Sequence, residues 1–281
     1  MLCRSADLIA EAHASGSGIA AFNVITLEHV QAVADAARRT GRPAIVQISQ
    51  NAVRHHGGDV VPLAAATTAA AGRSDARLAL HLDHVEDVAL LHRTAECGAS
   101  SVMFDASRLP DEENIAATRE AVRWAHGQGL FVEAELGEIG GKGSAHTPGV
   151  RTDPGDAARF VAETGVDALA VAVGSSHAMV SRTAALDLGL IARIRDAVPV
   201  PLVLHGSSGV PHETLRAALV HGMTKINIGT LLNVAFTRAV RATLAESPEL
   251  VDPRRYLAPA RDAMTDAVAD CLTALGAPGP R

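Results

Sequence analysis

The chain has 281 residues, 48% of them hydrophobic and 20% charged, a composition typical of a globular protein and not of a disordered one. Its net charge is −6 and its Lys and Arg residues are scattered, which excludes the basic stripe that nucleic acids or anionic membranes require. Apolar runs such as Ala168–Val173 are too short to span a bilayer, and the N-terminus lacks the apolar core of a signal peptide, so we expect a cytoplasmic protein. The three cysteines, Cys3, Cys97 and Cys271, lack metal-binding spacing, so we expect histidine and carboxylate ligands for any metal.

Eight short apolar segments with the character of β-strands alternate with longer amphipathic segments. This alternation is typical of parallel strands joined by right-handed crossovers, and eight units predict an α/β fold of the (β/α)8 TIM barrel type. The predicted strands are Ile19–Asn23, Ala44–Ser49, Leu78–Leu82, Ser101–Phe104, Leu130–Glu135, Ala168–Val173, Leu202–Leu204 and Lys225–Ile228. The predicted helices are Leu27–Arg39, Val85–Cys97, Glu112–Gln128, Pro154–Thr164, Asp187–Asp196 and His212–His221.

The remaining segments indicate one domain over residues 1–281. Leu231–Leu244 and Pro259–Leu275 are expected to be C-terminal closing helices, and no Ser- or Pro-rich linker interrupts the chain. Glycine follows most predicted helices, as in Thr40-Gly41, which is typical of a left-handed residue after a helix end. Leu136–Pro154 is a long irregular segment rich in glycine and polar residues, which predicts either a functional lid or a disordered tip. An open doubly wound sheet is the alternative arrangement, but the first predicted strand is not followed by a glycine-rich loop.

Polar and ionisable residues follow the predicted strands, and in a (β/α)8 barrel those positions surround one mouth. Three of them, His84, His177 and His205, are histidines, and three protein ligands with an open position are typical of a catalytic zinc site. His81 lies within its strand and is expected in the barrel interior. His55 and His56 are expected in a surface loop. The other histidines outside the glycine-rich loop are expected to be solvated, namely His13, His29, His92, His126, His212 and His221.

Carboxylates accompany these histidines. Asp83 precedes His84, where it could transfer a proton beside a metal or orient the neighbouring histidine. Glu133 and Glu135 are two residues apart and therefore face the same side of a strand. Because two neighbouring carboxylates repel each other unless a cation lies close, this pair also indicates a metal ion.

Two glycine-containing segments, Gly206–Gly209 and Gly229-Thr230, follow the seventh and eighth predicted strands. The corresponding loops of many (β/α)8 barrels bind phosphate through backbone N–H groups and hydroxyls. The sequence therefore predicts a phosphate group on the substrate.

Six motifs in this order resemble those of the class II, metal-dependent ketose-bisphosphate aldolases, the family of the fructose- and tagatose-bisphosphate enzymes. The resemblance extends from about Ala21 to the C-terminal helix. Its motifs are LxLDH (Leu80–His84), SVMFDAS (Ser101–Ser107), VEAELGxIGG (Val132–Gly141), LAVAVGSSH (Leu169–His177), PLVLHGSSG (Pro201–Gly209) and KINIGT (Lys225–Thr230).

The resemblance implies a ligand set for one catalytic Zn²⁺, formed by His84, His177 and His205. It also implies that Glu135 joins this set or forms an alternate metal position with Asp105, so a second monovalent or divalent cation is possible. The zinc ion would act as a Lewis acid on a phosphorylated sugar.

Other roles follow from the same resemblance. Asp83 would be the acid/base that transfers a proton, and Asn227 would steady the enediolate. Gly206, Ser208, Thr230 and Arg182 would hold the phosphate of the dihydroxyacetone phosphate half, and Ser49 would line the site. The partners expected are a phosphorylated sugar and further copies of the chain, in a homodimer or homotetramer.

The sequence departs from the family pattern in the loop after the fifth strand. Gly143 stands where the family has a glutamate that exchanges a proton. Lys142, Glu138 or His146 could replace it, and His146 is the best chemical candidate because its ordinary pKa is near neutral. The alternative is that His146 is an exposed loop residue and the enzyme is slow or inactive toward ordinary ketose bisphosphates. Arg254 or Arg255 could bind a second phosphate, because Ala258 stands where some members have arginine. An aldolase is expected. One alternative is a degenerate aldolase that acts as a metabolite-binding or regulatory protein. Another is a zinc hydrolase, which the absence of an H-x-H pair on the first strand disfavours.

Overall fold

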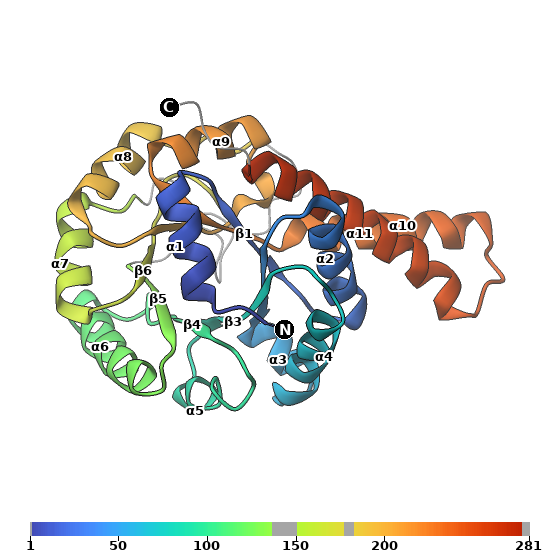
Figure 1. The fold of residues 1–281 in the computed structure, drawn as a ribbon, viewed down its shortest axis with the longest axis horizontal. Helices are drawn as coiled ribbons and strands as arrows, with labels where there is room; N and C mark the ends of the chain where they lie inside the picture. Colours follow the sequence, from blue (N-terminus) through green and yellow to red (C-terminus); the bar gives the residue numbers. More distant parts are fainter. Residues whose placement is uncertain (1, 137–150, 177–182, 277–281) are drawn as a thin grey trace.

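The computed structural model describes residues 2–136, 151–176 and 183–276. Eight parallel strands close into a barrel in chain order, which confirms the predicted (β/α)8 fold (Figure 1). The strands are β1 (Ile19–Asn23), β2 (Ala44–Ser49), β3 (Leu78–Val85), β4 (Ser101–Phe104), β5 (Phe131–Glu135), β6 (Ala168–Ala170), β7 (Leu202–Leu204) and β8 (Met223–Ile228).

Helices surround the barrel. They are α1 (Ser5–Ser15), α2 (Leu27–Thr40), α3 (Gln50–His55), α4 (Val61–Gly72), α5 (Val88–His92), α6 (Asp111–Gly127), α7 (Pro154–Thr164), α8 (Leu188–Ala197), α9 (His212–His221), α10 (Thr230–Glu246) and α11 (Pro253–Leu275). Helices α1, α3 and α4 are absent from the sequence prediction. Most of the predicted elements match the structure to within two residues at each end, and larger differences occur at β3, α5, β6 and α11. The predicted helix Val85–Cys97 is shorter because β3 continues through Val85, strand β6 is half its predicted length, and β8 begins two residues earlier.

The strands are apolar because helices cover them on the outside, so both faces of each strand are buried. Helix α7 illustrates the covering layer: its Ala157, Phe160 and Val161 form an apolar stripe that is buried against the barrel. Gly165 follows this helix with a positive φ of 73°, as predicted for a residue after a helix end.

Helix α1 packs against the barrel at the N-terminal end of its strands, where the Ser5 hydroxyl is 3.0 Å from that of Ser100 (Figure 1). Helices α10 and α11 form a hairpin that projects beyond the barrel. Helix α11 begins at Pro253, six residues before its predicted start, because Asp252 caps it through a hydrogen bond from the Arg254 amide. Pro259 lies inside the helix and does not begin it.

One prediction about the histidines is wrong. His29 is only 3% exposed, because its ring stacks on Phe236 and contacts the side chains of Thr26 and Asn233. Its position in the first turn of an amphipathic helix gave no sign of the second helix that covers it. His55 and His56 are exposed, as predicted.

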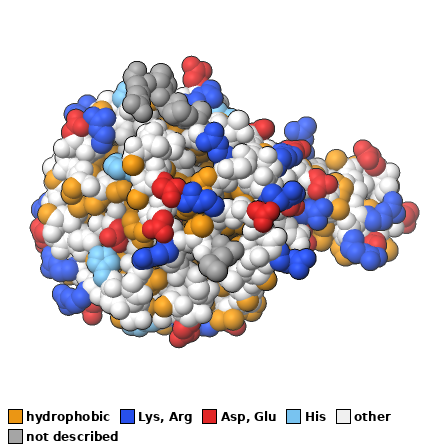
Figure 2. All heavy atoms as spheres, viewed as in Figure 1, with side chains coloured by type: hydrophobic (Ala, Val, Ile, Leu, Met, Phe, Trp, Pro, Cys, Tyr) orange, Lys and Arg blue, Asp and Glu red, His pale blue; other side chains and the backbone are white. Residues whose placement is uncertain are grey.

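On the face shown in Figure 2, acidic and basic side chains of the described residues are intermingled, and no extended basic area is visible. None of the described helices has the length and apolar composition needed to cross a membrane.

Candidate active site and metal centre

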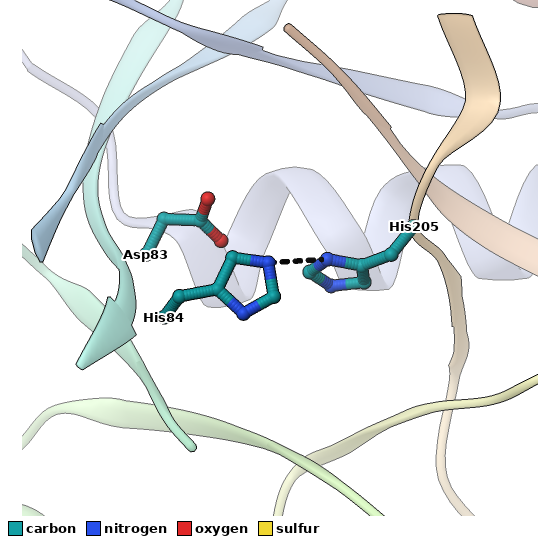
Figure 3. A group of neighbouring side chains, drawn as sticks. All are labelled: Asp83, His84 and His205. Atoms are coloured by element: carbon teal, nitrogen blue, oxygen red, sulfur yellow. Dashed lines mark hydrogen bonds between the residues drawn. The ribbon is translucent and has the colours of Figure 1, made fainter. Parts of the chain in front are cut away.

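Asp83 and His84 are neighbours on β3, yet both face the mouth of the barrel (Figure 3). Regular alternation would send adjacent side chains to opposite faces. The register between β3 and β4 shifts between Leu82 and Val85, and His84 has a φ of 48°, the only positive value at a non-glycine residue in the described segments. Such a conformation costs about 1–3 kcal/mol and is concentrated at functional sites. The irregularity delivers two reactive side chains from one strand end.

The rings of His84 and His205 meet edge to face across the mouth, with Nε2 of His84 3.1 Å from Nδ1 of His205 (Figure 3). A carboxylate lies behind each ring: Asp105 is 2.7 Å from Nδ1 of His84, and Glu133 is 2.8 Å from Nε2 of His205. Ionised carboxylates only accept hydrogen bonds, so each ring donates its outer N–H. The two nitrogens that face each other then both present lone pairs, and the Asn227 amide nitrogen lies 3.3 Å from Nδ1 of His205. A cation between the two rings would be bound by both lone pairs.

These donors fit zinc. Two imidazole nitrogens bound at about 2.0–2.1 Å in tetrahedral geometry lie roughly 3.3 Å apart, close to the 3.1 Å observed. Carboxylates behind zinc-binding histidines are a common arrangement, because they fix which ring nitrogen is protonated. The ligand atoms of Asp83, His84 and His205 lie within 4.8 Å of one another, as do those of His84, Asp105 and Glu135.

The cation beside Glu133 differs from the sequence prediction. The Lys225 ammonium group lies 2.6 Å from Oε2 of Glu133, and both side chains are at most 1% exposed. The prediction assigned the charge of the glutamate pair to a metal, and this is a correction for Glu133. Lys225 was missed because it lies inside β8, three residues before the strand end. Glu135 is fully buried, and its backbone carbonyl accepts a hydrogen bond from Asn114.

His81 lies in the barrel interior, as predicted, and its Nδ1 is 2.8 Å from the Ser101 hydroxyl. Burial, reinforced by the nearby charge of Lys225, lowers the pKa of His81 well below its ordinary value. The ring is therefore neutral and does not contribute a charge to the mouth.

Asp83 is 2% exposed, and side-chain amides from β1 and β2 hold its carboxylate. Asn23 donates a hydrogen bond of 2.7 Å to Oδ2, and Gln47 reaches the same oxygen at 3.5 Å. Oδ1 has no hydrogen-bond partner among the described residues. Burial raises the pKa of this carboxyl group. The positive charge that His84 and His205 carry when they are protonated, the charge of Lys225 and the hydrogen bond from Asn23 outweigh burial, so the pKa lies below its ordinary value. Asp83 is thus ionised at neutral pH, with one oxygen available.

The loops after β7 and β8 meet beside Asp83, His84 and His205, in a cavity of about 280 Å³. Gly206 adopts a φ of 65° and turns the chain into a short 3-10 helix, in which the Ser207 hydroxyl donates to the backbone carbonyl of Asn227. Thr230 is the first residue of α10, and the next amide donates to the Ser208 hydroxyl at 3.2 Å. A helix N-terminus and a left-handed turn side by side suit an anion.

The structure thus brings most of the predicted site together. Residues that line the cavity are Asn23, Ser49, Asp83, His84, His205, Gly206, Ser208, Asn227 and Thr230. Ser49 also caps α3 by accepting a hydrogen bond from the Ala52 amide. Among the described residues, Arg254 and Arg255 are not part of its lining, and Arg254 is paired with Asp252. Predicted residues His146, His177 and Arg182 lie outside the described residues.

Comparison with known proteins places this chain in a family. Residues 3–280 match the family model described as fructose-bisphosphate aldolase class-II. The YdjI aldolase from Escherichia coli K12 is 31% identical, with a TM-score of 0.84 over 99% of both chains. A putative fructose-1,6-bisphosphate aldolase from Coccidioides immitis is 29% identical, with a TM-score of 0.85 over 98% of this chain and 97% of the other.

The fructose-bisphosphate aldolase from Campylobacter jejuni shares the fold, with a TM-score of 0.82 at 22% identity over 98% of this chain and 95% of the other. The family match covers almost the whole chain, and the resemblance that the sequence motifs indicate is confirmed. The chain belongs to the class II fructose-bisphosphate aldolase family.

Proposed function

We propose that this chain is a zinc-dependent aldolase that cleaves or forms a carbon–carbon bond in a phosphorylated ketose, with dihydroxyacetone phosphate and an aldehyde as the cleavage products. One observation carries the proposal: two ring nitrogens face each other at 3.1 Å, each ring has a carboxylate behind it, and the ionised Asp83 lies beside them. His84 and His205 would hold the metal with His177, and Glu135 and Asp105 offer a second cation position. When bound, the zinc ion would stabilise the negative charge that develops as the carbon–carbon bond breaks.

Asp83 is proposed as the group that moves the proton. In the cleavage direction its free Oδ1 takes the proton of the hydroxyl group that becomes the aldehyde carbonyl, and the electron pair of the broken bond passes to the other half as an enediolate. Asn23 and Gln47 keep Oδ2 engaged, which leaves Oδ1, buried and without a partner among the described residues, to take the proton. Asn227, 5% exposed and beside the His205 ring, would orient that enediolate.

The phosphate group would bind between the loops after β7 and β8. Gly206, Ser208 and Thr230 supply the turn, a hydroxyl group and a helix N-terminus there. Arg182 is proposed to add the positive charge, and Ser49 lines the same cavity. The phosphate would then fix the triose half while the aldehyde half is exchanged.

A degenerate aldolase that binds metabolites remains the second candidate, because Gly143 stands in place of the family's loop glutamate. The discriminating experiment is a panel of ketose phosphates and bisphosphates, assayed for release of dihydroxyacetone phosphate by protein with stoichiometric zinc. Turnover of one substrate supports the aldolase. Tight binding of the panel without any turnover supports the binding protein and contradicts the proposal.

A further inference from the structure

Lys225 is an unusual residue in this chain. The sequence has only two lysines, Lys142 and Lys225, among 25 Lys and Arg residues, so arginine serves at almost every cationic position. Lys225 is also completely buried, in the middle of β8. Lysine is seldom fully buried unless it is paired, and its compact ammonium group acts as a point donor where a planar guanidinium does not fit.

The partner of Lys225 links it to the metal centre. Glu133 uses one oxygen for each neighbour: Oε2 lies 2.6 Å from the Lys225 ammonium nitrogen, and Oε1 lies 2.8 Å from Nε2 of His205. All three side chains are at most 1% exposed, so water does not compete for these contacts. The chain Lys225–Glu133–His205 runs from the barrel interior to the mouth.

We propose that Lys225 and Glu133 are positioning residues that determine which nitrogen of His205 carries the proton. An ammonium group can only donate, and a carboxylate with that donor on Oε2 accepts on Oε1 as well. Nε2 of His205 is therefore protonated, and Nδ1 presents its lone pair to His84 and the mouth. The inference rests on the proposed metal site for its consequence, but the protonation pattern is a property of this chain alone.

A merely structural ion pair is the alternative. Buried ion pairs add little net stability compared with apolar residues of similar volume, so stability alone does not account for the pair. The two roles differ in what happens when Glu133 becomes an amide. In Glu133→Gln, Lys225 still needs an acceptor and takes the amide oxygen, which turns the NH₂ group toward Nε2 of His205. Nε2 must then accept, and the proton moves to Nδ1, where it blocks metal binding.

A second substitution should reverse this effect. In Glu133→Gln/Lys225→Met the donor that fixed the amide is gone, so the amide oxygen can turn to His205 and accept the proton of Nε2 again. We expect Glu133→Gln to lower zinc affinity about 10–100-fold, the usual loss when the partner of a metal-binding histidine is changed, and the double variant to recover most of it. A structural role predicts no recovery of affinity in the double variant.

The experiment is nitrogen-15 NMR of the histidine rings, with and without zinc, on wild type and both variants. The His205 signals are identified by their loss in His205→Asn, and zinc affinity is measured by chelator competition. Asp266→Asn is the matched control, because it also replaces a carboxylate by an amide in an ion pair, here the exposed Arg39–Asp266 pair. Melting curves verify that the variants are folded.

We expect a protonated Nε2 of His205 in wild type with or without zinc, and an Nε2 without a proton in metal-free Glu133→Gln. If Glu133→Gln does not fold, the protonation of the two His205 ring nitrogens in wild type tests the inference by itself. A wild-type His205 with an unprotonated Nε2 overturns the inference, as does an unchanged pattern in folded Glu133→Gln. Failure of wild type to bind zinc would instead refute the proposed function and leave the protonation test intact.

Discussion

Asp83→Asn separates proton transfer from every other task of the site. The amide oxygen can keep the 2.7 Å hydrogen bond from Asn23, and the amide nitrogen then takes the place of Oδ1, which has no partner among the described residues. An amide nitrogen has no lone pair for a proton. The fold, the histidine ligands and the phosphate loops keep their contacts, so only the proton acceptor is lost.

The expected loss is about 10²–10⁴-fold in kcat for cleavage, the usual contribution of a positioned acid/base, which corresponds to roughly 2.7–5.5 kcal/mol of barrier height. Affinity for dihydroxyacetone phosphate should not change, because the hydrogen bonds of Asp83 go to Asn23 and Gln47 and not to the loops proposed to bind the phosphate. Asp83→Ala should show a similar loss in kcat, with bound zinc retained.

The assay follows release of dihydroxyacetone phosphate from the best substrate of the panel, with zinc content and melting temperature measured on the same samples. Asp87→Asn is the matched control: Asp87 lies four residues away and caps α5, and asparagine is an equally good cap. If cleavage by Asp83→Asn stays near the wild-type rate, Asp83 only supports its neighbours, and the proposed proton transfer is refuted.

Three further predictions concern the phosphate, the fold and the glycine-rich loop. Ser208→Ala with Arg182→Ala should weaken binding of a phosphoglycolohydroxamate-like analogue at least roughly tenfold, because each hydrogen bond to a charged group contributes about 1.5–3 kcal/mol; unchanged affinity would place the phosphate elsewhere. Burial lowers the pKa of His29, so the fold holds a neutral ring while the unfolded chain takes up a proton below its ordinary pKa of 6.5, and stability present above this pH is lost as the pH falls. His29→Gln should therefore flatten the dependence of urea-unfolding free energy on pH between about 7 and 5, by up to about 1.4 kcal/mol per pH unit; identical curves for the two proteins would contradict the burial argument. Proton exchange into dihydroxyacetone phosphate should be slower in His146→Ala than in wild type, and equal rates would remove His146 from the mechanism.

The barrel could be predicted because its strands are buried on both faces and read as apolar runs, while glycines such as Gly165 mark the helix ends. The ends of elements were harder to predict where they depend on tertiary contacts. Strand β3 extends through Val85 only because of its register shift against β4, and α11 begins at Pro253 because Asp252 caps it. Sequence periodicity contains neither fact.

The candidate site was predictable to the extent that it lies at strand ends. His84 and His205 meet because the barrel closes, and the positive φ that turns His84 toward the mouth cannot be inferred from residue types. The glutamate pair on β5 did indicate a cation, but its identity depends on which strand faces Glu133, and the closed barrel supplies Lys225 from β8. The available signal was that Lys225 is one of only two lysines in a chain whose other cationic residues are arginines.

The most direct test of the proposed function is a zinc titration of metal-stripped wild-type protein, followed by release of dihydroxyacetone phosphate. The paired histidines predict that activity is absent without metal, rises in proportion to added zinc and reaches a plateau at about one ion per chain. His205→Ala should neither retain zinc nor recover activity. Full activity in stripped protein, or full zinc occupancy in His205→Ala, would contradict the assignment.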